Sequence, residues 1–446
     1  MKHLLVLFLG TIIISAGFSA NGQNIWSLQK CIDYALENNI QIKQQEINTN
    51  YYENQVNQAK SNRLPNLNGQ IGNDYSFGRS LTYYNTYENV NSATVSGGVG
   101  TNFTIWNGFI LNNEIKKQEL DLQATMMDLQ KAKDDIMLYI AGSYMEILFA
   151  EEVVLVDSAQ LVVTQQQINR TQQLVDAGSL AKGSLLEIQA QLAREELQLV
   201  NDKNSVQLAY LNLYQLLELP IEESFRIEKP LLPEIKANLT MSNSFDVFNN
   251  AISTRPEIKA AQLRVESAQK QLDIAKGYRY PSLSFNANYY NLYNNQYSYI
   301  GSDEKISFGD QLKNNSRSSA SFNLSIPIFN RMQVKNGISN ATLQISNYKY
   351  QLQTASNTLR KEIEQAYTNA YAALNRYVST QKAVISMQEA FRYVEEKFNV
   401  GMVNSVDYSL QKNQLTAAQS QLLQAKYEFI FRTKILDFYN GIPIEL

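Results

Sequence analysis

The strongest constraint on this chain is an internal duplication of a long, helix-forming segment. The stretch from Trp106 to Pro220 contains no proline in its interior, and it returns as the stretch from Phe329 to Pro443. Gly178 and Gly401 lie at matching positions of the two copies, so neither copy has gained or lost a residue up to its turn. Each copy predicts a long helix, a tight turn at the glycine and a returning helix, and their equal lengths indicate a strut.

The apolar residues of these helices are spaced for packing against other helices. In the second copy they follow alternating steps of three and four: Leu352, Ala355, Leu359, Ile363, Ala366, Ala370, Ala373 and Tyr377 going out, and Leu415, Ala418, Leu422, Ala425 and Phe429 coming back. This spacing predicts a coiled-coil seam with many small side chains. At about 1.5 Å per residue, a helix from Gly108 to Ala177 would span roughly 100 Å, which exceeds the size of a compact domain.

A pair of alternating segments precedes each helical hairpin. Residues 66–77 and 94–105 in the first half, and 282–293 and 319–328 in the second, place apolar side chains on one face and small polar ones on the other. A strand of about 10 to 12 residues with this pattern is typical of a lipid-facing barrel strand, and the alternative is a half-buried sheet in a soluble protein. Because a barrel needs about eight strands, four strands from one chain require several chains to pool their strands.

These patterns predict a mainly α fold with a β-barrel portion, built from one duplicated unit. The predicted divisions are a signal peptide at 1–22, a first repeat at 23–220 (helix, β-hairpin 66–105, helical hairpin 107–217), an equatorial linker at 221–249, and a second repeat at 250–446 (helix, β-hairpin 282–328, helical hairpin 330–440). The two shorter helices of each repeat would stack end to end beside one long helix. The linker would then form a belt around the middle of the shaft.

Composition excludes several classes of function. The formal net charge of -3 gives no basic surface for nucleic acid. Lys2 followed by the apolar run Leu4–Ile14 predicts a secretory signal peptide, and the only histidine, His3, would leave with it. The only cysteine, Cys31, is expected to be a packed helix residue. No catalytic, metal-binding or nucleotide-binding motif stands in its required context, so we expect no enzyme activity, no metal and no cofactor.

Several short motifs carry a family resemblance that covers essentially the whole mature chain. They are Arg63-Leu64-Pro65-Asn66-Leu67 and Arg279-Tyr280-Pro281-Ser282-Leu283 where helices give way to strands, Trp106-Asn107-Gly108 and Ile326-Pro327-Ile328-Phe329-Asn330 at the strand-to-helix corners, and Phe398-Asn399-Val400-Gly401 with Val406-Asp407 at the second turn. In these features and in its duplication the chain resembles the TolC-type outer-membrane factors, the exit ducts of bacterial tripartite efflux and type I secretion systems.

The resemblance implies an architecture, partners and site residues. It implies a homotrimer with a twelve-stranded barrel in the lipid of the bacterial outer membrane and a long helical barrel in the periplasm. A periplasmic adaptor would dock at the hairpin tips Gly178, Ser179, Leu180, Gly401, Met402 and Val403, and an inner-membrane pump of RND or ABC type would supply the energy. Asp407 matches an acidic gate position of relatives, Leu410 stands where a second aspartate can follow, and Glu187 is a further candidate for an acidic ring.

Two other classes of protein share some of these features. A secreted coiled-coil structural or adhesive protein would explain the helices and the signal peptide, but it would not explain four matched amphipathic strands. A periplasmic adaptor would have one hairpin flanked by compact β-domains, whereas here the hairpin is duplicated. The sequence therefore favours a passive export duct in the outer membrane.

Overall fold

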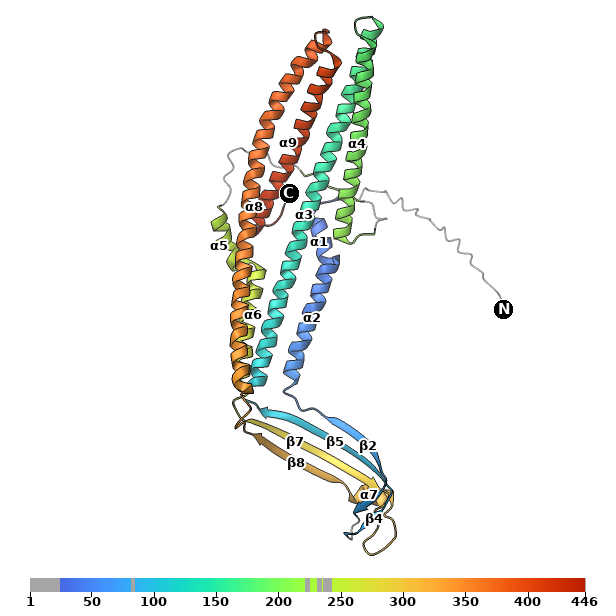
Figure 1. The fold of residues 1–446 in the computed structure, drawn as a ribbon, viewed down its shortest axis with the longest axis vertical. Coiled ribbons are helices and arrows are strands. Elements are labelled where there is room, and N and C mark those ends of the chain that lie inside the picture. Colours follow the sequence, from blue (N-terminus) through green and yellow to red (C-terminus); the bar gives the residue numbers. More distant parts are fainter. Residues whose placement is uncertain (1–24, 82–84, 221–224, 231–234, 236–242, 446) are drawn as a thin grey trace, which may run out of the picture.

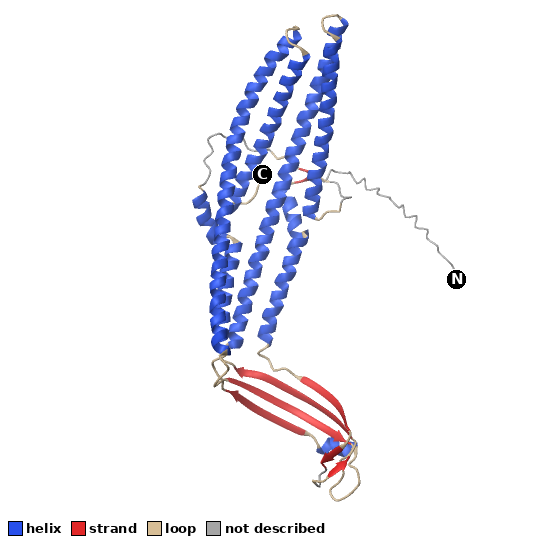
Figure 2. Cartoon of the chain, in the orientation of Figure 1, coloured by secondary structure: helices blue, strands red, loops and turns tan. Residues whose placement is uncertain are grey.

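A computed structural model describes residues 25–81, 85–220, 225–230, 235 and 243–445. The predicted signal peptide at residues 1–22 lies outside the described residues. Long helices form a shaft, a twisted sheet lies at one end of it, and two hairpin turns form the other end (Figure 1). Helices dominate and the four longest strands form one sheet (Figure 2), so the predicted mainly α class with a strand portion is confirmed.

The two long helical hairpins are near-copies in structure as well as in sequence. They consist of α3 (Ile110–Asp176) with α4 (Lys182–Leu217), and α8 (Gln333–Asn399) with α9 (Ser405–Tyr439). The helices α3 and α8 each have 67 residues, which corresponds to about 100 Å of length. Phe109 and Met332, which precede them, both adopt left-handed φ values of 65°. The duplication thus extends to the unusual backbone corner where sheet becomes helix.

The shorter helices stack in pairs beside the long ones. The pairs are α1 (Leu28–Asn38) with α2 (Ile40–Ser61), and α5 (Ser244–Thr254) with α6 (Pro256–Gly277). The sequence predicted one helix before each sheet segment, but the structure breaks both helices. Asn39 leaves the helical conformation and its side chain accepts hydrogen bonds from the amides of Gln41 and Ile42, which caps α2.

The break in the second repeat has a related cause. Pro256 occupies the first turn of α6, where a missing amide hydrogen costs nothing, and Arg255 before it is extended. The helix α5 begins at Ser244, inside the segment 221–249 that was predicted to be a linker, because Asn243 caps it by accepting a hydrogen bond from the amide of Phe245.

The four longest strands form one antiparallel sheet that joins the two repeats. Its strands are β2 (Asn68–Ser76), β5 (Ser92–Trp106), β7 (Ser282–Asn294) and β8 (Arg317–Ser325), in the order β2-β5-β7-β8. The central pair β5 and β7 brings the repeats together, with Phe103 opposite Phe285. The outer edges of β2 and β8 have no partner strand within the described chain.

The loops at the far end of the sheet contain structure that the sequence did not predict. They hold a small ribbon, β3 (Arg79–Leu81) with β4 (Tyr87–Asn89), and a short helix, α7 (Phe308–Asn314). Gln311 of α7 is buried and donates hydrogen bonds to the carbonyls of Asn294 and Ile306. These bonds hold α7 against the end of β7, so the polar segment between β7 and β8 is a folded cap.

The main apolar core lies near mid-shaft, where α1, α3, α4 and α9 meet. Cys31 is fully buried there, as expected, and burial raises the pKa of its thiol to about 12. A two-residue parallel pair, β1 (Ile25–Trp26) with β6 (Arg226–Ile227), closes this level of the shaft. The predicted seam is also present, since Leu359, Ile363, Ala366, Ala370 and Ala373 of α8 are buried, together with Ala418, Ala425 and Phe429 of α9.

Candidate functional site at the hairpin tips

The two tip turns share one backbone conformation at their glycine. Gly178 and Gly401 adopt left-handed φ values of 71° and 76°, which glycine accepts without strain. In the first turn the amides of Ser179 and Leu180 donate to the carbonyl of Leu174, and in the second the amide of Met402 donates to the carbonyl of Lys397. Both helices therefore end with satisfied carbonyls.

The tip side chains differ in exposure. Met402 is 78% exposed. Ser179 is exposed, whereas Leu180 and Val403 are half-buried. The six predicted tip residues therefore lie at the two outermost turns of the shaft, where a partner can reach them (Figure 1).

An apolar cluster directly below the tips holds the two hairpins together. Ile168, Leu185 and Ile188 come from the first hairpin, and Phe398 and Tyr408 come from the second. The rings of Phe398 and Tyr408 lie 4.8 Å apart between centroids. Because this cluster spans both hairpins, any movement of one tip against the other must disturb it.

The predicted gate residues Glu187 and Asp407 occupy different environments. Glu187 is half-buried and accepts a 2.6 Å hydrogen bond from the hydroxyl of Ser405, which links α4 to α9. Asp407 is exposed in the first turn of α9, and its amide donates to the side chain of Asn404, the cap of that helix. No hydrogen bond joins these two carboxylates in the part of the chain that the structure describes.

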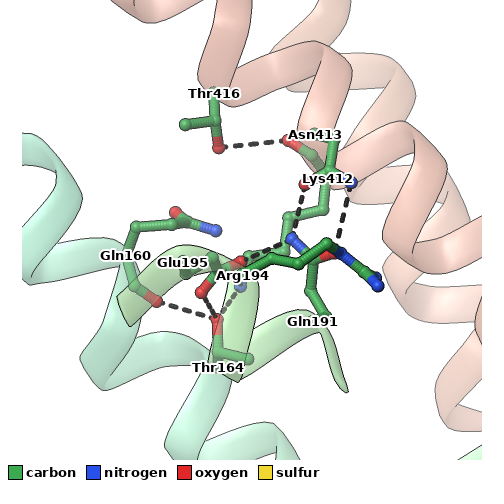
Figure 3. A network of polar contacts seen from close by, with 8 residues as sticks. All are labelled: Gln160, Thr164, Gln191, Arg194, Glu195, Lys412, Asn413 and Thr416. Carbon is green, nitrogen blue, oxygen red and sulfur yellow. Dashed lines mark hydrogen bonds and ion pairs between the residues drawn. The ribbon is translucent and has the colours of Figure 1, made fainter. Parts of the chain in front are cut away.

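A buried ionic network lies further along the shaft and was not predicted from the sequence (Figure 3). Lys412 of α9 is only 2% exposed, and its Nζ lies 3.3 Å from the carboxylate of Glu195 on α4. Lys412 also donates to the hydroxyl of Thr164 on α3, and that hydroxyl donates to Glu195. Burial lowers the pKa of Lys412, an effect that the charge of Glu195 opposes.

An amide pair next to this network adds a second link between the hairpins. Gln191 of α4 donates to Asn413 of α9 at 2.6 Å, and Asn413 donates back at 3.3 Å. Arg194 and Glu195 also bond to Gln191, so the amide pair and the ionic network form one polar layer (Figure 3). One signal in the sequence could have revealed this layer: the apolar stripe that passes through Leu415 continues back to Lys412 and Tyr408 at the same spacing.

A groove of about 520 Å³ runs between the hairpins beside the polar layer. Asp157 of α3 and Asp202 of α4 contribute to its wall, together with Glu195 and the side chains of α9. Burial raises the pKa of Asp157 to about 7, and hydrogen bonding to Asp202 and the negative charges of Asp202 and Glu195 act in the same direction. This carboxyl group therefore changes protonation near neutral pH.

Other kinds of site are not apparent in the described residues. Within them no three His, Cys, Asp or Glu side chains gather in a way that could hold a metal ion. None of the described helices combines the length and the apolar character needed to cross a membrane.

A family model now decides what kind of protein has this architecture. The model described as outer membrane efflux protein matches residues 31–218 and 247–430, which correspond to the two repeats. The chain belongs to the outer membrane efflux protein family. Members of this family are channels of the bacterial outer membrane that extend into the periplasm and serve in efflux and type I secretion. The secreted adhesive alternative is therefore set aside.

Relatives of known name span nearly the whole chain. The outer membrane protein TolC of Escherichia coli K12 is 24% identical over 96% of this chain and 84% of its own length. The proteases secretion protein PrtF of Dickeya chrysanthemi is 19% identical over 94% of this chain and 88% of its own length. A crystal structure of CusC matches the fold with a TM-score of 0.78 at 17% identity, covering 93% of this chain and 92% of CusC.

As an outer membrane efflux protein, the chain is a channel protein of the bacterial outer membrane with a periplasmic extension. The family relationship gives the role of the whole molecule, and the geometry above gives the contacts that hold its two hairpins together. Members of the family are channels rather than enzymes.

Proposed function

We propose that the chain forms a homotrimeric export duct and carries out no chemical reaction of its own. Three copies of the four-stranded sheet would close a twelve-stranded barrel in the lipid of the outer membrane, and the helices would form the periplasmic tube below it. Transport through the duct is passive, and an inner-membrane pump of RND or ABC type supplies the energy.

The sheet carries this proposal. Phe103, Phe285 and Phe322 lie opposite one another on three adjacent strands, with ring centroids 5.6 and 5.0 Å apart. Ile71 is 88% exposed and Phe322 is 71% exposed on the single chain. An exposed apolar face of this kind needs lipid around it, and the two open edges need partner strands. A closed ring of sheets in the membrane meets both needs.

The tips are the docking place for a periplasmic adaptor in this proposal. Gly178, Ser179 and Leu180 lie in the turn between α3 and α4, and Gly401, Met402 and Val403 lie in the turn between α8 and α9. These two turns form the end of the shaft away from the sheet (Figure 1). Exposed Met402 supplies an adaptable apolar contact. The TolC relationship supports this assignment, because TolC-like channels work with adaptor and pump partners.

The gate in this proposal is the acidic pair at the tip. Asp407 would project from three subunits into one ring, and Glu187 would hold the first hairpin to Ser405 of the second. Opening then requires the Glu187–Ser405 contact and the apolar cluster around Phe398 and Tyr408 to separate. This is a change between two packings of the hairpins rather than a chemical step.

Single-channel conductance in planar bilayers tests the gate. We expect Glu187→Gln to raise the mean conductance of the purified protein, because it weakens the hydrogen bond that holds the first hairpin to Ser405. We expect Asp407→Asn to lower the preference of the channel for cations, because it removes the negative charges of the ring. The matched control is Glu389→Gln, which removes an exposed acidic group elsewhere on α8. Unchanged conductance in Glu187→Gln together with unchanged cation preference in Asp407→Asn, with intact trimers, would contradict the assignment of the gate to these residues.

A further inference from the structure

The sheet has a polar face on the side opposite to Phe103, Phe285 and Phe322. Residues that lie opposite each other in an antiparallel pair place their side chains on the same face, so the strand register assigns each paired residue to a face. Asn102 donates a hydrogen bond from its side-chain amide to Asn286 on this face. Most of its other paired residues are also small and uncharged, for example Ser96, Ser284, Ser319 and Ser321. The polar face is therefore a nearly neutral surface of hydroxyl and amide groups.

One row across the polar face has a different composition. The register places Gln70, Gly98, Tyr290 and Arg317 opposite one another on β2, β5, β7 and β8. Among the paired residues of this face in the described chain, Tyr290 is the only aromatic residue and Arg317 is the only basic one. Asp74, the only acidic one, pairs with Thr94 two rows closer to the loops. We call Tyr290 and Arg317 the tyrosine–arginine row.

Glycine on β5 makes room for the Tyr290 ring. A Cβ at Gly98 would lie 3.4 Å from Cδ2 of Tyr290 and 2.8 Å from the carbonyl oxygen of Tyr289. The ring of Tyr290 therefore leans over β5 into the space that a side chain at position 98 would take. It is half-buried in this position, so part of the ring remains accessible on the polar face.

Arg317 has no counter-charge to neutralise it. Its side chain is exposed, and within the described residues its guanidinium makes no hydrogen bond, ion pair or ring contact. Other arginines of the chain are engaged: Arg264 pairs with Asp128, and Arg79 in the loops stacks on Tyr87 at 5.5 Å. Arg317 thus presents an unpaired positive charge beside an accessible aromatic ring.

We infer that the tyrosine–arginine row is a selective level of the duct, which binds anionic molecules that carry an aromatic ring. This inference rests on the proposed homotrimer, in which the polar face lines the lumen and three copies of the row lie at one level. A guanidinium binds sulfonate, carboxylate or phosphate oxygens, and rings of arginine favour anions in pores. The Tyr290 ring stacks on the aromatic part of the same molecule.

The position of the row makes it separable from the gate. The row lies in the sheet, whereas Asp407 lies at the opposite end of the molecule (Figure 1). The two ends of the duct therefore carry charges of opposite sign. A charged molecule added on the side of the sheet loops meets the row first, and one added on the side of the tips meets Asp407 first.

Block of single-channel current in planar bilayers tests the row. The probes are naphthalene trisulfonate, citrate as an anion without an aromatic ring, and trimethylnaphthylammonium as an aromatic cation. Because the long polar shaft does not cross a bilayer, the protein inserts with its loops facing the compartment opposite to the one in which it is added. We expect naphthalene trisulfonate in that opposite compartment to block at a lower concentration than citrate, and the cation to block least.

Variants of the row should weaken this block selectively. We expect Arg317→Gln to raise the half-blocking concentration of naphthalene trisulfonate about tenfold, because the anion loses a charge-assisted contact. Arg317→Lys keeps the charge and should restore most of the block. Tyr290→Leu should weaken the block by naphthalene trisulfonate about threefold and leave the block by citrate unchanged, because only ring stacking is lost. The matched control is Arg79→Gln, which removes an exposed arginine of the loops outside the row and should change neither block.

The outcomes separate this inference from the proposed function. Weaker block in Arg317→Gln and Tyr290→Leu, with recovery in Arg317→Lys, supports the row. If trimeric channels conduct but these variants are blocked as the native protein is, the row is not selective and the duct stands. Equal block by the aromatic cation and the aromatic anion from the loop side would also overturn the inference. If the purified protein forms no conducting channel, the proposed duct fails and the row fails with it.

Discussion

At the scale of single residues, Lys412 is the most deeply buried charged side chain in the described part of the shaft. Lys412 is only 2% exposed, and Glu195 and Thr164 surround its Nζ, which offsets part of the cost of burying an ammonium group. Lys412 and these two partners lie on three helices and belong to two hairpins, so the contact fixes the position of α9 against α3 and α4. A buried pair of this kind specifies one arrangement and penalises others.

Removing one partner of this pair should be costly. We predict that Lys412→Met destabilises the periplasmic helices by about 3 kcal/mol, because Glu195 would remain buried without a counter-charge. Hydrogen exchange of the α9 amides measures the loss. The double variant Lys412→Met with Glu195→Leu should recover most of the protection, and a double variant as unstable as the single one would contradict the explanation.

Asp157 should make the same region sensitive to pH. Its pKa is raised from 3.8 to about 7, so the folded protein binds a proton that the unfolded chain releases. The resulting stabilisation is complete below pH about 4 and is lost as pH rises through about 7. Relative to the native protein, Asp157→Asn should therefore become more stable as pH increases from 5 to 8.

The measurement is the thermal midpoint of the shaft, followed by circular dichroism at several pH values. Glu196→Gln is the control, since Glu196 is an exposed acidic residue on α4. An Asp157→Asn variant that follows the native protein in parallel across this range would show that the carboxyl group does not titrate there.

At the scale of elements, the corner between sheet and shaft is closely packed. Gly108 has a φ of 67°, and a Cβ at this position would lie 2.5 Å from the carbonyl oxygen of Gly277. Gly178 at the tip has a similar φ of 71° but has open space around it. Gly108 is needed both for its left-handed φ and because a Cβ would clash there. Gly178 is needed for its left-handed φ alone.

This difference predicts unequal effects of the same substitution. Gly178→Ala should cost about 1 kcal/mol, the usual penalty for a left-handed alanine. Gly108→Ala should cost clearly more, because the strand-to-helix corner must open to relieve the clash. Thermal denaturation of the two variants compares them directly, and equal midpoints would contradict the close packing of α3 against the end of α6.

The elements differ in how far the sequence predicts them. The long helices and four strands follow from periodicity that repeats over many residues. The break at Asn39 depends on one polar residue in a polar helix, which gives no warning of a cap. Pro256 did signal the break at Arg255, but the prediction ran one helix through it. The helix α7 has seven residues and no apolar period. The Lys412 network joins residues far apart in the chain, so it requires knowledge of which hairpins meet.

At the scale of the whole molecule, the chain has surfaces without partners along its entire length. The sheet has two open edges, α2 and α8 have uncovered faces, and the tips end in exposed turns. Membership of the outer membrane efflux protein family accounts for these unfinished surfaces together, because a ring of identical chains would complete them. In the proposed duct the duplicated strut sets the length of the tube, and the sheet sets its place in the membrane.

Electron microscopy of the detergent-extracted, purified protein tests the central claim most directly. The account predicts a hollow particle with three-fold symmetry and a shaft roughly 100 Å long, the length that the 67-residue helices require. A solid rod, or a monomer that stays in solution without detergent, would contradict the trimeric duct.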